Sequence, residues 1–241
     1  MAIPFSDTVN GTGIYQQTLK IMGVDSVQWP IINVVNTSNH WLDTLTGYAI
    51  AADKRFQWDN TNHTKLPEGT TPSVAGQSDY SFLTDEQGNT IITLTGISRL
   101  DSASGNYIPL SLVDRNDPNT DLTTFGTGTG IPTEYDKIAD NIIRLNLKPA
   151  STVAAYLKFY FQRTSSYYTA SSTTKTSGFS PLLDNGFVVN SAYVGALTLG
   201  LQNLQALGIE RQVEEKKMMQ YFADRNRDDV SRMSPARENN R

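Results

Sequence analysis

The sequence of 241 residues contains no cysteine and only two histidines. Without cysteine there is neither a disulfide framework nor a thiolate metal site, and two histidines are too few for a histidine-rich metal cluster. No apolar stretch approaches the roughly 20 residues that a membrane-spanning helix needs. The first residues, MAIPFSDTVNG, lack the charged and then apolar pattern of a signal peptide. We therefore expect a protein that is made in the cytoplasm and does not enter a membrane.

Charge is also scarce, because charged residues make up 18% of the sequence and the formal net charge is −4. This balance excludes a chain-wide basic surface for nucleic acid, while a local basic patch stays compatible with it. Ser, Thr, Asn, Gln and Gly take the place of charge, a composition typical of β-structure with many polar turns. Aromatic residues at 10% are enough for a packed core, so disorder of the whole chain is not expected.

The N-terminal part of the sequence has helical periodicity. A short helix is predicted over Ile14–Met22 and ends at Gly23, and a longer helix follows with apolar residues at steps of three and four. We expect Ser26 to cap the longer helix and Pro30 to lie in its first turn. The apolar stripe consists of Ile31, Val34, Val35, Trp41, Leu42, Leu45, Tyr48, Ala49 and Ala52.

Helical periodicity returns near the C-terminus. Pro181–Leu201 is small and apolar on nearly all sides, which predicts a buried helix. A second, charged helix is predicted over Ile209–Asp229. Val230–Arg241 contains Pro235 and too few apolar residues for a core, so we expect an extended tail. The main apolar residues of the charged helix are Met218, Met219, Tyr221 and Phe222.

The two helical ends are expected to pack together. The N-terminal helices are too few to bury their own apolar stripe, and the Pro181–Leu201 helix supplies the missing partner. In this arrangement Trp41 and Leu45 face Leu197, which predicts one helical body made from both ends of the chain.

Between the helical ends, from Leu66 to about Ser180, turn-forming residues separate short runs that alternate between apolar and polar positions. The clearest strand is Thr152–Arg163, with apolar residues at every second position from Val153 to Phe161. Hairpin turns are predicted at Asp101–Asn106 and Ala139–Asn141. The other predicted strands are Tyr80–Leu83, Thr90–Leu100, Tyr107–Val113, Glu134–Ile138 and Ile142–Leu147.

The order of helices, strands and helices predicts an α+β fold. Residues 1–65 and 181–229 form the helical body. Residues 66–180 form an inserted antiparallel β-sandwich or barrel-like domain, and residues 230–241 form the extended tail.

Several groups of residues are similar to chemical motifs, and each lacks an essential part. Gly126-Thr-Gly-Thr-Gly130 precedes Ile131-Pro132 and a predicted strand instead of the helix N-terminus that a phosphate loop requires. Neither His40 nor His63 adjoins a strained nucleophile turn. Neighbouring carboxylates in one helix diverge by about 100°, and Asp114–Asp117 lacks the spacing of an EF-hand loop. The carboxylate pairs are Glu214/Glu215 and Asp228/Asp229. We expect no enzyme, metal or cofactor.

Six short stretches carry a resemblance to a known family. They lie at the end of the N-terminal helices, inside the β-region and at the C-terminus. The stretches are RFQWDNTNHTKLP (55–67), AGQSDY (75–80), IPTEYDK (131–137), LKFYFQR (157–163), RNRDD (225–229) and SPAR (234–237). Together they resemble the head-to-tail adaptor proteins of tailed bacteriophages, also called head-completion or connector proteins, over nearly the whole chain.

The resemblance implies a structural virion protein that forms a ring, usually a dodecamer, beneath the portal of the DNA-filled head. It implies that the helical body packs around the ring, that the β-domain faces the tail and that the C-terminal segment, about Asp224–Arg241, reaches into the portal. Its partners are then other copies of itself, the portal protein and the next neck or tail protein, with no membrane. Genomic DNA passes through the channel without specific binding, which an acidic chain favours. The arginines expected to bind the portal are Arg225, Arg227, Arg232, Arg237 and Arg241.

Three alternatives stay open at this stage. The protein can belong to the virion at another position, as a stopper, a tail terminator or a minor tail component. It can instead be a glycan-binding β-sandwich module, in which Trp58, Tyr167 and Tyr168 stack on sugar rings. An enzyme would require a carboxylate pair hidden in the β-domain.

Overall fold

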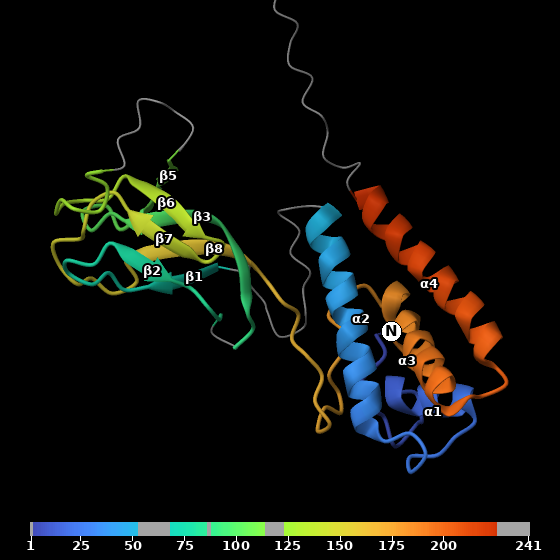
Figure 1. The fold of residues 1–241 in the computed structure, drawn as a ribbon. Helices are drawn as coiled ribbons and strands as arrows, with labels where there is room; N and C mark the ends of the chain where they lie inside the picture. The colour runs from blue at the N-terminus through green and yellow to red at the C-terminus, as the bar shows by residue number, and fades with distance from the viewer. Residues whose placement is uncertain (1, 53–67, 86–87, 114–122, 226–241) are drawn as a thin grey trace, which may run out of the picture. The chain divides into compact units, whose positions relative to one another are not determined.

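The computed structural model describes residues 2–52, 68–85, 88–113 and 123–225. Contacts divide the chain into two compact units. A helical unit is formed by residues 1–60 and 167–241, and a β-unit is formed by residues 61–166 (Figure 1). The predicted α+β class and the helical body made from both chain ends are confirmed.

The C-terminal boundary predicted for the β-domain, Ser180, is wrong. The chain leaves the β-unit after Ser166, and Tyr167–Ser180 belongs to the helical unit. Tyr168 and Phe179 are buried in the helical core, which explains why this segment stays with the helices. The predicted N-terminal boundary, at residues 65 and 66, lies outside the described residues.

Helix α3 lies at the centre of the helical unit and packs against each of the other three α-helices, as Figure 1 shows for α2 and α4 on either side of it. This position explains its unusual composition, because a helix surrounded by neighbours has no polar face. The prediction of a buried helix is confirmed over most of α3, including Phe187–Ala192. The elements of the unit are α1 (Ile14–Met22), α2 (Ile31–Ala52), the 3₁₀ helix η1 (Pro181–Leu183), α3 (Asp184–Leu199) and α4 (Leu204–Arg225).

The helix ends confirm some predictions and correct others. Helix α1 has the predicted bounds, and Gly23 ends it in the left-handed conformation with φ 71°, where a side chain would be strained. Ser26 is not the cap of α2, because it lies in a turn before the helix. In this turn the Asp25 carboxylate accepts hydrogen bonds from the N–H groups of Val27 and Gln28. Helix α4 begins at Leu204, earlier than the predicted Ile209. The predicted tail, 230–241, lies outside the described residues.

The β-unit consists of two four-stranded sheets, in the orders β1-β8-β3-β4 and β2-β7-β6-β5. Buried residues of both sheets form one apolar core, in which the rings of Phe82 and Phe159 lie 4.2 Å apart. The strands are β1 (Glu68–Thr71), β2 (Asp79–Ser81), β3 (Ile91–Leu100), β4 (Tyr107–Pro109), β5 (Ser111–Leu112), β6 (Glu134–Ala139), β7 (Ile142–Leu145) and β8 (Leu157–Arg163).

Most predicted strands are present, with three differences. The predicted strand Tyr107–Val113 is divided at Leu110, so that β4 pairs with β3 in one sheet and β5 pairs in parallel with β6 in the other. The predicted strand from Thr152 begins only at Leu157, because Ala155 adopts a positive φ of 50°. Strand β1 was not predicted. Both hairpin turns are confirmed, since the N–H of Asp101 donates to Asn106 O and Ala139 pairs with Ile142.

Candidate interaction surfaces

Trp41 and Leu45 are buried in the core of the helical unit, as predicted. The predicted partner Leu197 is wrong, because its side chain is 56% exposed near the end of α3. The residue of α3 that lies against Trp41 is Gly186, where an added Cβ would come within 2.8 Å of the indole Nε1. The two ends of the chain therefore pack as expected but through an earlier turn of α3.

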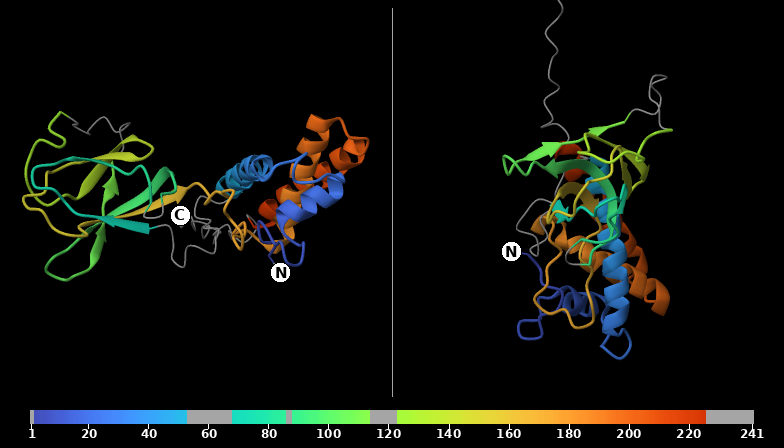
Figure 2. Two further views of the ribbon diagram at one scale, coloured as in Figure 1. Left: turned by 90° about the horizontal axis from the view of Figure 1, so that it is seen from below. Right: turned by 90° about the vertical axis from the view of Figure 1, so that its left-hand side faces the viewer.

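The N-terminal segment around Phe5 packs into the same core. The Phe5 N–H donates to Lys175 O at 2.8 Å, and the Phe5 ring stacks on Tyr168 with ring centroids 4.7 Å apart. Both views of Figure 2 show this deep-blue N-terminal segment beside the orange segment that follows the β-unit. The N-terminal residues are thus a structural part of the helical unit.

Asp184, at the start of α3, holds these segments together. Its buried carboxylate accepts hydrogen bonds from the Ile3 N–H at 2.8 Å and from the Ser177 hydroxyl at 2.7 Å. Burial raises the pKa of Asp184, and the two hydrogen bonds oppose this shift. Asp184 therefore links the N-terminal segment, the segment before α3 and α3 itself.

A groove of about 400 Å³ lies between α1, α3 and α4, and we call it the α4 groove. Its apolar side chains are unevenly buried: Val189 is covered, whereas Ile209 is 60% exposed and Val213 is 47% exposed. Ile21 adds an exposed apolar side chain from α1. The polar residues of the groove are Asn185, Glu210 and Glu214. The groove thus combines exposed apolar side chains with polar and acidic ones, and the single chain leaves it partly uncovered.

Glu214 and Glu215, the carboxylate pair considered in the sequence, have different environments in α4. Its side chain is buried and accepts hydrogen bonds from the Asn185 amide at 3.0 Å and from Lys217 Nζ at 2.7 Å. Glu215 pairs with Arg211 instead, at 3.0 Å. Glu210 is exposed and makes no hydrogen bond or ion pair within the described part of the chain, so it supplies the uncompensated charge of the α4 groove.

One of the predicted portal-binding residues, Arg225, lies at the C-terminal end of α4. The helix contains 22 residues and is therefore about 33 Å long. Arg225 is its last residue. Arg227, Arg232, Arg237 and Arg241 lie outside the described residues. The structure thus places the start of the arginine-rich segment at the end of a long helix, opposite the end that begins near α3.

Two of the three residues expected to stack on sugar rings, Tyr167 and Tyr168, are described. Tyr168 is buried against Phe5 and Phe187. Tyr167 is half-exposed, and its hydroxyl donates to Asp43 at 2.7 Å; burial and this bond raise its pKa to about 12. Trp58 lies outside the described residues. The proposed role of Tyr168 is therefore wrong.

The chemical motifs tested in the sequence do not become sites in the described residues. Gly126–Gly130 forms a turn that pairs with Asn146 and Lys148, and both Gly128 and Gly130 pack against Leu147. His40 is exposed on α2, while His63 and Asp114–Asp117 lie outside the described residues.

Within the same ranges no three His, Asp or Glu side chains gather as metal ligands, and none of the helices combines the length and apolarity needed to cross a membrane. Comparison with protein-family models and with curated protein sequences found no match.

The α4 groove was not predicted, although its signal is visible in the sequence. Helix α4 buries one stripe, made of Leu207, Glu214, Met218 and Phe222. Ile209 and Val213 lie off this stripe, one helical turn apart from each other. A pair of exposed apolar residues beside the buried stripe of a charged helix favours a second partner for that pair.

Proposed function

We propose that this protein is a structural component of a bacteriophage virion that forms a ring-shaped adaptor between the head portal and the tail. The observation that carries the proposal is the α4 groove, where Ile21, Ile209 and Val213 leave apolar side chains exposed on the unit expected to build the ring. Exposed apolar surface that joins several elements is typical of sites of association.

A closed ring requires two different, complementary faces on each subunit. The α4 groove supplies one of them, with Ile209 and Val213 as its apolar centre and Glu210 at its edge. The resemblance to adaptor proteins supplies the expectation of twelve subunits. The low net charge of −4 is compatible with a channel through which DNA slides without being held.

The C-terminal segment is proposed to bind the portal. It follows directly from α4, and five arginines lie between positions 225 and 241. Guanidinium groups form bidentate bonds with carboxylates, so such a segment suits acidic grooves between portal subunits. A stopper or a tail terminator would use the same ring surfaces with a different neighbour, and binding to the portal separates these roles.

Native mass spectrometry of the protein, alone and mixed with the portal protein of the same phage, tests ring formation. The wild type is expected to form one ring-sized species in the presence of the portal. The double variant Ile209→Asp/Val213→Asp should fail to form it, because two charges would be desolvated in the interface. Leu83→Asp is the matched control, since Leu83 is also exposed, at 62%, but lies in the β-unit. Normal ring formation by the double variant would contradict the role of the groove.

Removal of residues 226–241 tests the portal role separately. The shortened protein is expected to keep its circular dichroism spectrum but to lose binding to DNA-filled heads. A full-length variant with Arg227, Arg232, Arg237 and Arg241 replaced by Gln should show the same loss. Normal incorporation of the shortened protein into heads would exclude this role of the segment.

A further inference from the structure

A second cavity, of about 380 Å³, lies at one end of the β-unit, and we call it the Arg99 pocket. Three segments that are distant in the sequence form it: the end of β3 with the following hairpin turn, the segment at Gly130, and the segment that leads into β8. Its lining residues are Arg99, Leu100, Asp101, Ser102, Ala103, Gly130, Ile131, Pro149, Ala150, Ser151, Val153 and Tyr156. Loops gathered at the end of a β-sandwich are a common position for binding sites.

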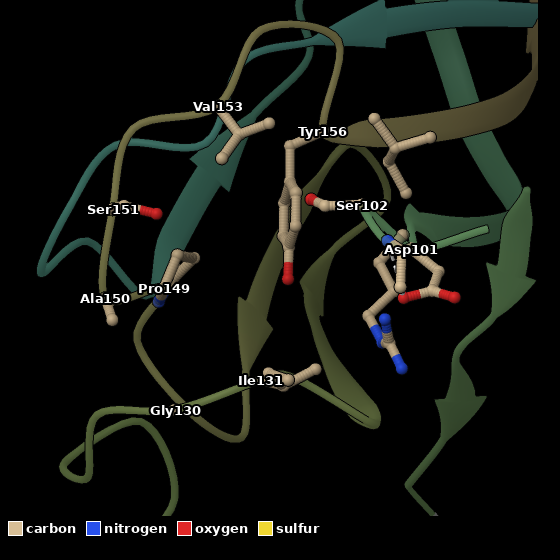
Figure 3. Close-up of a pocket in the computed structure, with 12 residues that line it drawn as sticks. Asp101, Ser102, Gly130, Ile131, Pro149, Ala150, Ser151, Val153 and Tyr156 are labelled. Carbon is tan, nitrogen blue, oxygen red and sulfur yellow. Dashed lines mark hydrogen bonds between the residues drawn. The ribbon is translucent and has the colours of Figure 1, made fainter. Parts of the chain in front are cut away.

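Most of the wall of this pocket is apolar. Figure 3 shows the Tyr156 ring between the Pro149–Val153 segment and the turn at Asp101 and Ser102, with its hydroxyl directed towards Ile131. Pro149 and the Tyr156 side chain are buried, whereas Ile131 is exposed at the rim. The volume is that of a small-ligand site, which typically has apolar walls and a few polar groups.

Two polar side chains of the pocket, those of Arg99 and Tyr156, have donor groups without a partner in the described part of the chain. Arg99 makes no hydrogen bond or ion pair within the described part of the chain, and the same holds for the Tyr156 hydroxyl. Burial raises the pKa of Tyr156, while the positive charge of Arg99 opposes this shift. The guanidinium and the phenol are therefore two available donors in one largely apolar cavity.

Asp101 is the one carboxylate among the lining residues, and its oxygens serve the hairpin turn. They accept a hydrogen bond from the Ser104 hydroxyl at 2.7 Å and a longer one from the Ala103 N–H at 3.5 Å. The Ser104 bond is the largest of the causes that lower the pKa of Asp101, and the Arg99 charge is a smaller one. The carboxylate of Asp101 thus stabilises the hairpin turn, and it forms no ion pair with Arg99.

We propose that the Arg99 pocket binds a carboxylate carried on an apolar group. The guanidinium of Arg99 pairs with the carboxylate, the Tyr156 hydroxyl donates a further hydrogen bond, and the apolar body lies against Ile131, Pro149 and Val153. Arginine is suited to this role because its planar donors match both carboxylate oxygens. Two sources have this chemistry: the C-terminal residue of a polypeptide and a free small carboxylic acid.

Isothermal titration of the full-length protein with four probes tests the proposal. The probes are N-acetyl-leucine, its amide, a hexapeptide ending in leucine with a free carboxylate, and the same peptide amidated. At least one free-carboxylate probe is expected to bind, and its amide at least about tenfold more weakly, because a charge-assisted pair is lost. Binding of the peptide alone identifies a polypeptide C-terminus as the source, and equal binding of both acids identifies a carboxylic acid in general.

Variants connect the binding to the pocket. Arg99→Gln should weaken the free-carboxylate probe by about tenfold or more, and Tyr156→Phe by a smaller factor. Arg144→Gln is the control, because Arg144 lies in the same unit but pairs with Asp79 at 2.8 Å. Circular dichroism establishes that each variant is folded. Equal affinity for acid and amide, unchanged binding by Arg99→Gln, or no binding of any probe would each overturn the proposal.

Discussion

At the scale of single residues, the contact between α2 and α3 depends on the missing side chain of Gly186. A Cβ at this position would lie 2.8 Å from Trp41 Nε1 and 3.0 Å from two indole carbons. The indole is itself buried and cannot move away without disturbing its neighbours. Gly186 therefore allows the bulkiest residue of α2 to approach the backbone of α3.

Replacing Gly186 by Ala is expected to destabilise the helical unit, because overpacking typically costs about 1–3 kcal/mol. Gly47→Ala is the matched control. Gly47 is also helical, but no atom lies within 4 Å of its added Cβ, and the higher helix propensity of Ala should stabilise it by up to about 1 kcal/mol. Urea unfolding followed by circular dichroism measures both. Equal stability of the two variants would contradict the close approach of Trp41.

Asp184 makes a prediction about pH. Burial raises its pKa in the folded protein above the value of an unfolded chain, so the folded state binds a proton more tightly. The resulting contribution to stability is fully present below the unfolded pKa and is lost as the pH rises through the folded pKa. This dependence is opposite to that of a carboxylate in a salt bridge.

The free energy of unfolding of the wild type and of Asp184→Asn, measured by urea unfolding between pH 3 and 8, tests this sign. The stability advantage of the wild type over Asp184→Asn is expected to decrease as the pH rises through the raised pKa and then to become constant. Ser177→Ala is a useful comparison, because it removes one bond to the same carboxylate and keeps the titrating group. An advantage that grows with pH would show that Asp184 has a lowered pKa.

At the scale of elements, α2 contains four consecutive residues of low helix propensity, Asn36–Asn39, and some of them make tertiary hydrogen bonds. Thr37 donates to the Ser191 hydroxyl of α3 at 2.8 Å. The Asn39 amide accepts from the Tyr168 N–H at 2.8 Å and donates to its carbonyl at 3.0 Å. These tertiary bonds offset the weak helix propensity of the Asn36–Asn39 segment. Thr37 and Asn39, two residues of low helix propensity, thus connect α2 to its neighbours.

Helix α3 is buried in its first part and more exposed towards its end, where Leu197 lies. The buried Leu45 of α2 and the exposed Leu197 can therefore be compared directly. Leu45 of α2 is fully buried, so Leu45→Asp would bury an unpaired charge and is expected to cost several kcal/mol. Leu197→Asp should change stability by less than about 1 kcal/mol, because the side chain is already largely in solvent. Melting temperatures of the two variants measure the difference. A loss of fold in Leu197→Asp alone would restore the packing predicted from the sequence.

The sequence predicted those elements that are defined by local periodicity. Helix α1, the two hairpin turns and most strands follow from apolar spacing and turn residues, and they occur where they were expected. Strand β1 and the parallel pair β5–β6 depend on partners distant in the sequence, which local spacing does not contain. The left-handed Ala155 likewise interrupts an alternating pattern that reads as continuous strand.

The candidate sites were less predictable for the same reason. The Arg99 pocket combines residues from positions 99 to 156, and no short motif connects them. The α4 groove combines α1, α3 and α4, and only its row of Ile209 and Val213 is visible as a pattern in the sequence. Trp41 and Leu45 were identified correctly as core residues. The partner in α3 was not, because a helix that is apolar on nearly all sides does not indicate which of its faces points towards α2.

At the scale of the whole molecule, the two units have separate cores. The apolar core of the helical unit contains residues from both ends of the chain and none of the residues that the structure describes between 61 and 166. The core of the β-unit contains only residues between Tyr80 and Phe161. A unit with its own closed core and about 100 residues is of a size that commonly folds alone.

The fragment 61–166 is therefore expected to be soluble, to show a strand-dominated circular dichroism spectrum and to unfold cooperatively in urea. The fragment 66–180, which follows the boundaries predicted from the sequence, provides the comparison. It carries Tyr168 and Phe179 without Phe5, Phe187 and Phe222, against which they pack in the full chain. We expect it to contain the same folded β-unit but to expose these rings, seen as stronger binding of a hydrophobic dye and a greater tendency to aggregate. An unfolded fragment 61–166 would show that the β-unit depends on the helical unit, and the division of the chain into two folding units would then be wrong.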